Sequence, residues 1–329
     1  MSVQVNRRAA LGLGSAAAAT TMLGTGSVAA APLAGSSAEQ IASSYQAQVQ
    51  AAGGSWNAYV SLPGSSTVAV DAASDTVVAA ESVNKIAVAT AVLDKVDRGL
   101  LTLSQTVQVT SDIVISDGDG IFRLDGAYPS TITLGHVLAA LLTISDDTAV
   151  RLCGLVAPAA EINQILLDKG FAQTQVTPVA DPNRFFLGQT TARETHDLLA
   201  ALVGGTLLAA SSTSYLLGLL RSPIAFTDGI RRTMSSDERA RIATKAGWLD
   251  NVRNEAGVVF DPSGSPQLIY ALFANGMPSG ADDFGATNPA VRARSLLGRS
   301  WLDILDGDPQ VKAVSLRYPA RQYRPVNGG

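Results

Sequence analysis

The stretch Ser82-Val83-Asn84-Lys85 is the most informative part of this 329-residue chain, and two later triplets share its chemistry. At the start of a helix, a spacing of three residues places the Ser82 hydroxyl and the Lys85 amine on one face, one turn apart. A serine hydroxyl becomes a strong nucleophile when a neighbouring base takes its proton, and a lysine held neutral can do this. Ser145-Asp146-Asp147 offers a second hydroxyl, and Lys245-Ala246-Gly247 offers a second amine. Together the three segments predict a serine hydrolase that relays protons around an acylated serine.

The sequence around these motifs predicts an α/β (α+β) fold. Some segments have apolar residues at helical spacing, and others have the pattern of strands. The expected helices are 37–52, 85–101, 134–156, 159–169, 193–203, 212–220 and 289–305, and the expected strands are 56–62, 67–71, 241–247, 254–261 and 267–274. Strands near both ends usually form one antiparallel sheet, with the middle of the chain inserted as a helical lobe. We expect the active site where the two lobes meet.

The segment 134–156 is apolar on nearly every face, which predicts the buried central helix of the helical lobe, with Thr133 as its cap. Ser145-Asp146-Asp147 interrupts this run, and polar groups in such a helix need partners or water. A helix boundary with a serine cap is the alternative interpretation. The only cysteine, Cys153, has apolar neighbours and no adjoining base, so we expect a small buried residue rather than a nucleophile.

The first 31 residues have the pattern of a twin-arginine signal peptide. Arg7-Arg8 precedes a weakly apolar run, and Ser27-Val28-Ala29-Ala30-Ala31 contains an A-x-A-like cleavage site. An N-terminal helix or membrane anchor is the alternative, but the apolar run is shorter than the ~20 residues that a membrane span requires. We therefore expect a secreted or extracytoplasmic protein without a stable membrane anchor.

The charge balance excludes some classes of partner. Removing the signal peptide takes away two arginines and leaves 22 basic against 28 acidic residues, a net charge of −6. This balance argues against nucleic acid and anionic membranes as partners. The remaining chain of about 298 residues is long enough to bury a large core. We expect a monomer with a small-molecule substrate.

The order of the motifs resembles that of the class A β-lactamases and related penicillin-recognising serine hydrolases. Ser82-Val83-Asn84-Lys85 looks like their S-x-x-K motif, Ser145-Asp146-Asp147 like S-D-N, and Lys245-Ala246-Gly247 like K-T-G; Thr190-Thr191-Ala192-Arg193-Glu194 also resembles their T-T-P-R-D segment. The resemblance covers roughly residues 36–307. It implies a β-lactamase-like domain at 32–329. Its α/β lobe would span about 32–80 and 240–307, its helical lobe about 81–239, and its C-terminal tail 308–329.

The resemblance also implies roles for residues. Ser82 would be the nucleophile, Lys85 would receive or relay its proton, and Ser145 would pass the proton to the leaving nitrogen. Lys245 would attract a substrate carboxylate, and the backbone N–H groups of Ser82 and Trp248 would form the oxyanion hole. The implied substrate-binding residues are Asp147, Ala246, Gly247, Trp248 and Arg253.

Two departures from the family pattern affect substrate binding. Asp147 stands where the family has an Asn that hydrogen-bonds the substrate and the catalytic lysine. An ionised carboxylate accepts hydrogen bonds but cannot donate them, and near Lys85 it favours the charged ammonium, which weakens a lysine base. Ala246 lacks the hydroxyl that would help to bind a substrate carboxylate.

The third departure concerns release of the acyl group. The family carries its deacylating glutamate in an E-x-x-L-N loop ahead of the T-T segment, but residues 171–191 contain no glutamate, and Asp181 is their only carboxylate. Asp181 is a possible deacylation base, although Asp-Pro-Asn is also an ordinary turn. A carboxylate there is needed to activate water against the acyl-enzyme. Without it, we expect acylation to proceed and hydrolysis to be slow.

Three further features are left with a structural interpretation. Arg253 and Glu255 either frame the carboxylate site or, as we expect, pair with each other. His136 and His196 are isolated on helices, so we predict no metal ligands and no cofactor. The basic tail is expected to be a solvated extension or a strap against the body; its basic residues are Lys312, Arg317, Arg321 and Arg324.

Three hypotheses follow from these observations. The first is an exported serine hydrolase that acylates Ser82 with a β-lactam or a similar cyclic or peptide amide, and so confers antibiotic resistance. The second is a D,D-peptidase or esterase with slow deacylation, favoured by the missing glutamate. The third is a non-catalytic ligand-binding relative, against which the intact serine and two lysines argue.

Overall fold

The computed structural model describes residues 35–64, 67–278, 282–308 and 316–320. The predicted signal peptide at 1–31 lies outside the described residues, as does most of the C-terminal tail. The helices are α1 (Ser37–Ala52), the 3-10 helix η1 (Glu81–Asn84), α2 (Lys85–Asp97), α3 (Phe122–Asp125), α4 (Leu134–Thr143), α5 (Asp147–Val156), α6 (Ala159–Asp168), α7 (Ala192–Val203), α8 (Ala210–Leu220), α9 (Ser236–Arg239) and α10 (Pro289–Gly307). The strands are β1 (Ser55–Leu62), β2 (Thr67–Ala72), β3 (Val78–Ala79), β4 (Thr106–Val109), β5 (Ser130–Thr133), β6 (Gln175–Pro178), β7 (Phe185–Thr190), β8 (Ile242–Leu249), β9 (Val252–Phe260) and β10 (Pro266–Asn275).

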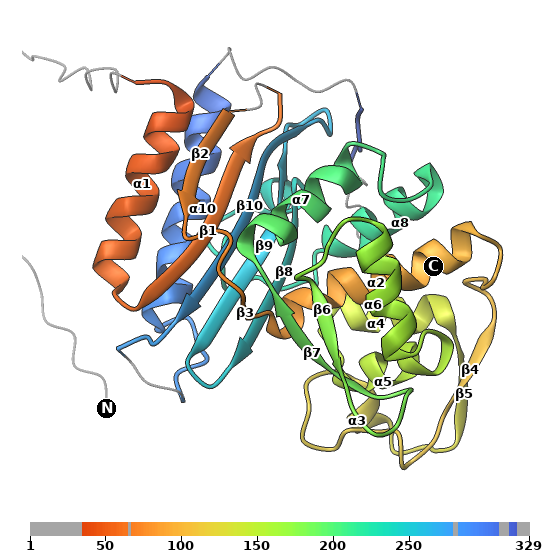
Figure 1. The fold of residues 1–329 in the computed structure, drawn as a ribbon. Helices are drawn as coiled ribbons and strands as arrows, with labels where there is room; N and C mark the ends of the chain where they lie inside the picture. The colour runs from red at the N-terminus through yellow and green to blue at the C-terminus, as the bar shows by residue number, and fades with distance from the viewer. Residues whose placement is uncertain (1–34, 65–66, 279–281, 309–315, 321–329) are drawn as a thin grey trace, which may run out of the picture. The chain divides into compact units, whose positions relative to one another are not determined.

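One five-stranded sheet joins strands from both ends of the described chain (Figure 1). Its order is β2-β1-β10-β9-β8, and each neighbouring pair is antiparallel. The predicted α/β fold class, with an antiparallel sheet flanked by helices, is therefore confirmed. Short strands form two further sheets, β3-β7-β6 and β4-β5. The strand β8, which carries Lys245, lies at an edge of the large sheet and packs against η1.

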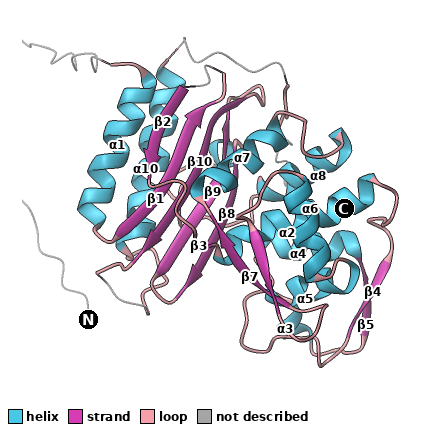
Figure 2. Cartoon of the chain, in the orientation of Figure 1, coloured by secondary structure: helices cyan, strands magenta, loops and turns pink. Residues whose placement is uncertain are grey.

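The helices α1 and α10 lie side by side and cover one face of the large sheet (Figures 1 and 2). A capping box between Ser36 and Glu39 begins α1, because each side chain accepts a hydrogen bond from the backbone of the other. Ile41 of α1 and Trp301 of α10 are fully buried against sheet residues such as Leu272. This layer is the smaller of the two main apolar clusters in the described residues.

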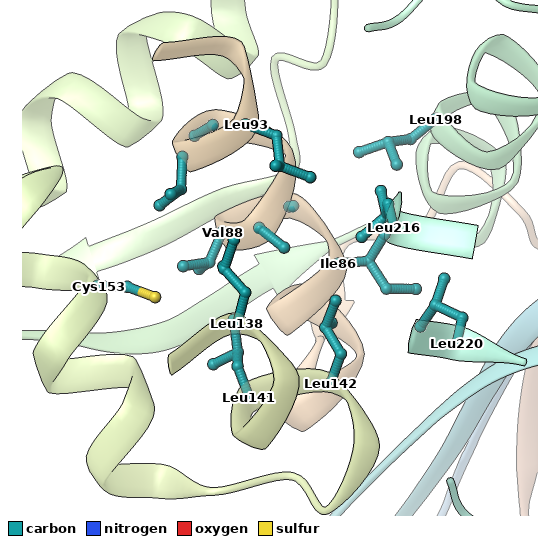
Figure 3. Packing of buried hydrophobic residues seen from close by; sticks show 14 of the residues in the cluster. Ile86, Val88, Leu93, Leu138, Leu141, Leu142, Cys153, Leu198, Leu216 and Leu220 are labelled. Atoms are coloured by element: carbon teal, nitrogen blue, oxygen red, sulfur yellow. The ribbon is translucent and has the colours of Figure 1, made fainter. Parts of the chain in front are cut away.

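The larger apolar cluster surrounds α2. Figure 3 shows Ile86, Val88 and Leu93 of α2 among side chains from α4, α5, α7 and α8. Because α2 is buried on nearly all sides from Lys85 to Leu93, its first residue is held in a fixed place. Cys153 is fully buried in this cluster, which confirms the prediction of a small core residue, and burial raises the pKa of its thiol to about 12.

The prediction of one continuous helix over 134–156 is wrong. The structure has two helices, α4 and α5, and the break falls at the polar triplet 145–147. Thr133 caps α4 as predicted, whereas α5 is capped by Asp146 rather than by Ser145. The Asp146 carboxylate accepts from its own helix at Ala149 N and from the backbone N–H groups of Ile121 and Phe122 at the start of α3. The polar groups therefore have partners because the helix ends there.

The end of the described chain acts as a strap. The Tyr318 hydroxyl donates to the Val203 carbonyl at 3.1 Å. The backbone carbonyl of Tyr318 accepts from the Arg221 guanidinium. Its ring meets Phe260 edge to face, with centroids 6.2 Å apart. In the described part of the chain, no single helix is long and apolar enough to cross a membrane. The helices α5 and α6 pass that test only as a pair, and they are bent by 81°.

Candidate active site

Lys85, Ser145 and Lys245 meet at one buried point, and we call these three residues the serine–lysine cluster. Lys85 begins α2, Ser145 lies between α4 and α5, and Lys245 lies on β8. The Lys85 Nζ is 2.6 Å from the Ser145 carbonyl oxygen and 3.0 Å from its Oγ. The Lys245 Nζ is 3.0 Å from the same Oγ. Three elements far apart in the sequence thus place two amines on one hydroxyl.

The backbone of Ser145 is in an unusual conformation. Its φ is +57°, in the left-handed region that costs a residue with a side chain of order 1–3 kcal/mol. This turn between α4 and α5 points both the hydroxyl and the carbonyl of Ser145 at the lysines. Glu81, the residue before Ser82, also has a positive φ, of 49°. Of the four non-glycine residues with positive φ among the described residues, Ser145 lies in a predicted functional segment and Glu81 directly precedes one; the other two are Ala73 and Asp250.

Ser82 lies in η1, and the edge strand β8 packs directly against its backbone. A Cβ added to Gly247 would lie 2.6 Å from the Ser82 nitrogen and 2.9 Å from that of Val83, so only glycine permits this approach. Side chains two residues apart on a strand share a face, so Lys245 and the Ser82 backbone lie on the same side of β8. Within the described residues, the Ser82 hydroxyl forms no hydrogen bond with Lys85. The Lys85 amine is turned toward Ser145 and Asp147 instead.

Burial lowers the pKa of both lysines in the cluster. For Lys85, burial is the largest effect, and the carboxylate of Asp147 opposes it at a distance of 2.7 Å between Nζ and Oδ1. For Lys245, which is fully buried, burial and the nearby charge of Lys85 bring the pKa well below its usual value. The two amines therefore differ, since one has a carboxylate in contact and the other does not.

Asp147 uses its second oxygen to hold a loop that the sequence analysis did not identify. Its Oδ2 accepts the Asp119 N–H at 2.9 Å, and the Asp147 N–H donates to the Asp119 carbonyl at 3.0 Å. A Cβ on Gly118 would lie 2.8 Å from the Asp147 carboxylate, and one on Gly120 would lie 2.2 Å from that of Asp146. The alternation Asp117-Gly118-Asp119-Gly120 was the signal that could have revealed this loop.

Asp119 itself is an additional acidic group near the cluster. Its pKa is raised by partial burial and by the charge of Asp147, while Lys85 and Lys245 act in the opposite direction. The expected role of Asp147 in binding substrate stays a prediction. In this structure both of its oxygens bind groups of the protein, Lys85 and the backbone of Asp119.

The other expected substrate-binding residues lie on β8 and β9. Ala246 is fully buried, and Trp248 is half-buried with its ring 5.4 Å from that of Phe226. Arg253 donates to the carbonyl groups of Asp250 and Asp283, so its guanidinium joins the β8–β9 turn to the segment before α10. The Cζ atom of Arg253 lies 4.4 Å from the centroid of the Phe284 ring.

The expected pairing of Arg253 with Glu255 is wrong. Glu255 is fully buried and forms its ion pair with Arg294 of α10, at 3.5 Å. It also accepts from the Thr244 hydroxyl at 2.7 Å and from the Ile230 N–H. Glu255 thus binds other buried groups of the protein instead of Arg253. The sequence could not reveal its pairing with Arg294, because α10 lies about forty residues later.

Asp181 is engaged in its own turn. Its Oδ1 accepts the Asn183 N–H at 2.9 Å, and its other oxygen lies 3.5 Å from the Arg184 guanidinium. None of its partners among the described residues belongs to the serine–lysine cluster. The turn packs on α5, where a Cβ on Gly154 would lie 1.9 Å from the Asn183 carbonyl oxygen. The structure therefore offers the proposed deacylation base no contact with the cluster.

The histidines have structural surroundings. His196 is buried, with Ser61 at 2.7 Å from its Nε2 and Asp197 at 2.8 Å from its Nδ1. His136 is exposed on α4. Within the described ranges, no group of three or more His, Cys, Asp or Glu side chains is placed to hold a metal ion.

The antiparallel sheet, the inserted helices and the serine–lysine cluster define the class of serine hydrolases built like β-lactamases. Comparison with known families agrees: the model of the β-lactamase enzyme family matches residues 39–303. The chain belongs to the β-lactamase enzyme family. No curated protein matches the sequence significantly.

Solved structures share this fold at low sequence identity. A β-lactamase from Sphaerobacter thermophilus has a TM-score of 0.68 and 20% identity, covering 82% of this chain and 97% of its own. A class A β-lactamase representative from Bacteroides cellulosilyticus has a TM-score of 0.68 and 20% identity, covering 83% and 100%. A mutant of PBP-A, solved as an acyl-enzyme complex with penicillin G, has a TM-score of 0.62 and 20% identity, covering 80% and 96%.

Proposed function

We propose that this protein is a serine hydrolase whose Ser82 is acylated by a β-lactam or by a similar cyclic or peptide amide. The observation that carries the proposal is the serine–lysine cluster beside Ser82, in which two buried amines share the Ser145 hydroxyl. A buried amine with a lowered pKa is the kind of group that activates a serine. A cluster of this kind has no evident use in a protein that only binds ligands.

In the proposed reaction, the Ser82 Oγ attacks the substrate carbonyl carbon and gives its proton to the cluster. The backbone N–H groups of Ser82 and Trp248 would stabilise the oxyanion, because β8 runs directly beside η1. Ser145 would return the proton to the leaving nitrogen. The positive charge of the cluster would attract a substrate carboxylate, with Gly247 allowing close approach and Ala246, Trp248, Arg253 and Asp147 framing the site.

The second candidate is a D,D-peptidase-like or esterase-like enzyme that releases its acyl group slowly. The observation that favours it is the environment of Asp181, whose partners lie within its own turn. Without a carboxylate from this turn at the acyl group, the base that the family pattern supplies to activate water is missing. The mutant of PBP-A seen as an acyl-enzyme complex with penicillin G gives a structural relative in which such a species was stable enough to be solved.

One experiment separates these readings of the site. The full chain is mixed with a chromogenic β-lactam, and colour and intact mass are followed together, with Ser82→Ala as the matched control. Turnover supports a β-lactamase, whereas a mass adduct without turnover supports the slow enzyme. Absence of an adduct and of any reaction with ester substrates would exclude both and leave a binding protein. An adduct on Ser82→Ala would show that another residue is the nucleophile.

Export is part of the proposal. The Arg7-Arg8 motif and the A-x-A-like site support transport by the twin-arginine route to an extracytoplasmic location. Replacing both arginines by lysine should retain the protein in the cytoplasm of a host that has this pathway. Unchanged export of that variant would refute the route.

A further inference from the structure

The hydrogen-bond partners of Lys85 bear on the charge of its amine. Its Nζ has three acceptors within 3.0 Å: the Ser145 carbonyl, the Ser145 Oγ and the Asp147 Oδ1. A lysine ammonium has three N–H donors and no acceptor. The Asp147 carboxylate at 2.7 Å favours the charged form, in which Lys85 donates to all three partners and has no lone pair to receive a proton from a serine.

The hydroxyl hydrogen of Ser145 needs an acceptor of its own. In the described part of the chain, its Oγ has two hydrogen-bond partners, the Nζ atoms of Lys85 and Lys245. Ser145 is only 7% exposed, and leaving a buried donor unpaired costs about 1–3 kcal/mol. With Lys85 charged, the acceptor that remains for the Ser145 hydrogen among its two partners is a lone pair on Lys245.

The surroundings of Lys245 match a neutral amine. Its Nζ donates to the Ala246 carbonyl at 2.7 Å, and no carboxylate among the described residues lies within 4.0 Å of it. The charged groups that influence it are Lys85 on α2, Asp147 on α5, Asp119 in the preceding loop and Glu255 on β9. Glu255 and Asp147 are each bonded to other donors, as described above. Complete burial and the neighbouring Lys85 charge both disfavour a second ammonium ion.

We propose that Lys245 is the neutral amine of the serine–lysine cluster and takes up the Ser82 proton through Ser145, while Asp147 holds Lys85 as an ammonium ion. This inference rests on the proposed acylation of Ser82. It assigns to Lys245 a proton-accepting role in place of the carboxylate-attracting role that the resemblance implied. The positive charge that faces the substrate is then that of Lys85.

The proton steps balance over one acylation. As the Ser82 Oγ bonds to the carbonyl carbon, its proton passes to the Ser145 Oγ, and the Ser145 proton passes to Lys245, which becomes an ammonium ion. When the carbon–nitrogen bond breaks, the leaving nitrogen keeps the electron pair and takes a proton from Ser145. Ser145 then recovers its proton from Lys245, which is again neutral. The contact between Ser82 and Ser145 is expected to form with substrate, since catalytic hydrogen bonds often tighten only in the complex.

The contacts at position 147 give a reason why this chain has Asp where the motif pattern has Asn. An Asn at that position would place an N–H₂ group against either the Lys85 ammonium or the Asp119 N–H, and donor would face donor. A carboxylate satisfies both, but it also fixes the charge of Lys85. The base function therefore passes to the lysine that has no carboxylate in contact.

The charge states can be measured directly by NMR, without any reaction. The full chain, which has five lysines, is labelled with ¹³C at the lysine ε-carbon and titrated, and signals are assigned with single Lys→Arg variants. We expect the Lys245 signal to report a neutral amine at about pH 7 and the Lys85 signal an ammonium ion. Asp147→Asn should move the Lys85 titration to lower pH more than that of Lys245, which provides a second assignment if an Arg variant does not fold. A charged Lys245 with a neutral Lys85 would overturn the inference.

The reaction provides the second test. With a fluorescent penicillin, Lys245→Arg should slow acylation about 10²–10⁴-fold, because an arginine cannot accept the proton. Lys85→Arg keeps the charge but must fit a larger head group into a buried site, so it should slow acylation by a smaller factor than Lys245→Arg does. The acylation rate of the parent should rise with pH along the Lys245 titration seen by NMR. Lys95→Arg is the matched control, since Lys95 is also buried and paired, with Glu161, outside the site.

The two tests separate the inference from the function on which it rests. If Lys85→Arg loses acylation and Lys245→Arg keeps it, the assignment of the base is wrong while the acylation stands. If the parent forms no adduct at all, the proposed function is wrong, and the NMR titration still decides which lysine is neutral.

Discussion

The serine–lysine cluster and the turn around Asp181 are the regions to which the resemblance assigns acylation and release, but the structure builds them very differently. In the cluster, Lys85 and Lys245 reach Ser145 from two separate elements, at hydrogen-bond distances. At the turn, Asp181 bonds to Asn183 and lies beside Arg184, within three residues of itself. The first region has the contacts that the proposed acylation of Ser82 requires. The second is arranged as a turn.

In the proposed reaction, acylation and release would therefore depend on separate parts of the chain. The residues proposed to activate Ser82 come from buried elements, whose positions the core fixes. The carboxylate for water activation would come from a surface loop, where sequence changes are better tolerated. A chain can therefore keep acylation and lose efficient release.

The largest expected effect is that of Ser82→Ala. It should lower adduct formation with a β-lactam at least about 10³-fold, because no other hydroxyl would replace the nucleophile. Intact mass measures the adduct, and circular dichroism checks that the variant is folded. A variant that still gains the mass of the β-lactam would remove Ser82 from the account.

Gly247→Ala sharpens the comparison by moving the nucleophile and leaving the turn at Asp181 alone. Its Cβ would lie 2.6 Å from the Ser82 nitrogen, so the backbone must shift, and overpacking of this kind costs about 1–3 kcal/mol. We expect lower stability in urea and slower acylation. Gly218→Ala in α8 is the matched control, since nothing lies within 4 Å of its added Cβ, and it should stabilise the protein by roughly 0.5–1 kcal/mol. Equal behaviour of the two variants would contradict the close approach of β8 to η1.

The two lysines should differ in stability measurements. Lys85→Met leaves the Asp147 carboxylate without its ammonium partner and should destabilise the protein by about 1–3 kcal/mol. Lys245→Met removes an amine without a carboxylate in contact and should cost less at neutral pH.

The pH dependence of this difference has a definite sign. Because the folded pKa of Lys245 is lowered, the unfolded chain binds a proton that the folded chain lacks between that pKa and about 10.5. The parent should therefore gain stability relative to Lys245→Met as pH rises through this window. Chemical denaturation at a series of pH values measures the gain, and a difference that falls with pH would show that Lys245 is charged in the folded protein.

The smallest expected effect is that of Asp181→Asn. A surface turn residue usually changes stability by less than about 0.5 kcal/mol, and without a role in release the adduct lifetime should change less than about twofold. The rate of loss of the adduct mass measures this. A much longer lifetime in the variant would restore Asp181 as the deacylation base.

Much of the fold could be predicted from local patterns. The helix at 37–52 buries one regular face, and β8, β9 and β10 are short segments bounded by turns and buried on both faces. The break between α4 and α5 was only the alternative interpretation of the polar triplet, because an apolar run of this length looks continuous when the backbone conformation of Ser145 is unknown. The cap belongs to Asp146, whose other partners lie at the start of α3, some twenty-five residues earlier.

The site was predictable only in part. The resemblance named Lys85, Ser145 and Lys245, and the structure brings them together. It could not show that Asp147 also holds the Asp119 loop or that Glu255 pairs with Arg294, because both contacts join segments with no regular sequence spacing. The donor count at Lys85, which distinguishes the two amines, depends on distances that no motif contains.

The most direct test of the central claim is the lifetime of the acyl group on Ser82. The full chain is mixed with a slight excess of benzylpenicillin, and intact mass is recorded until the mixture no longer changes. We predict a one-to-one adduct on Ser82 that forms and then persists long after the free penicillin has been consumed. Complete hydrolysis of the penicillin over many turnovers, without an adduct that accumulates, would contradict the account.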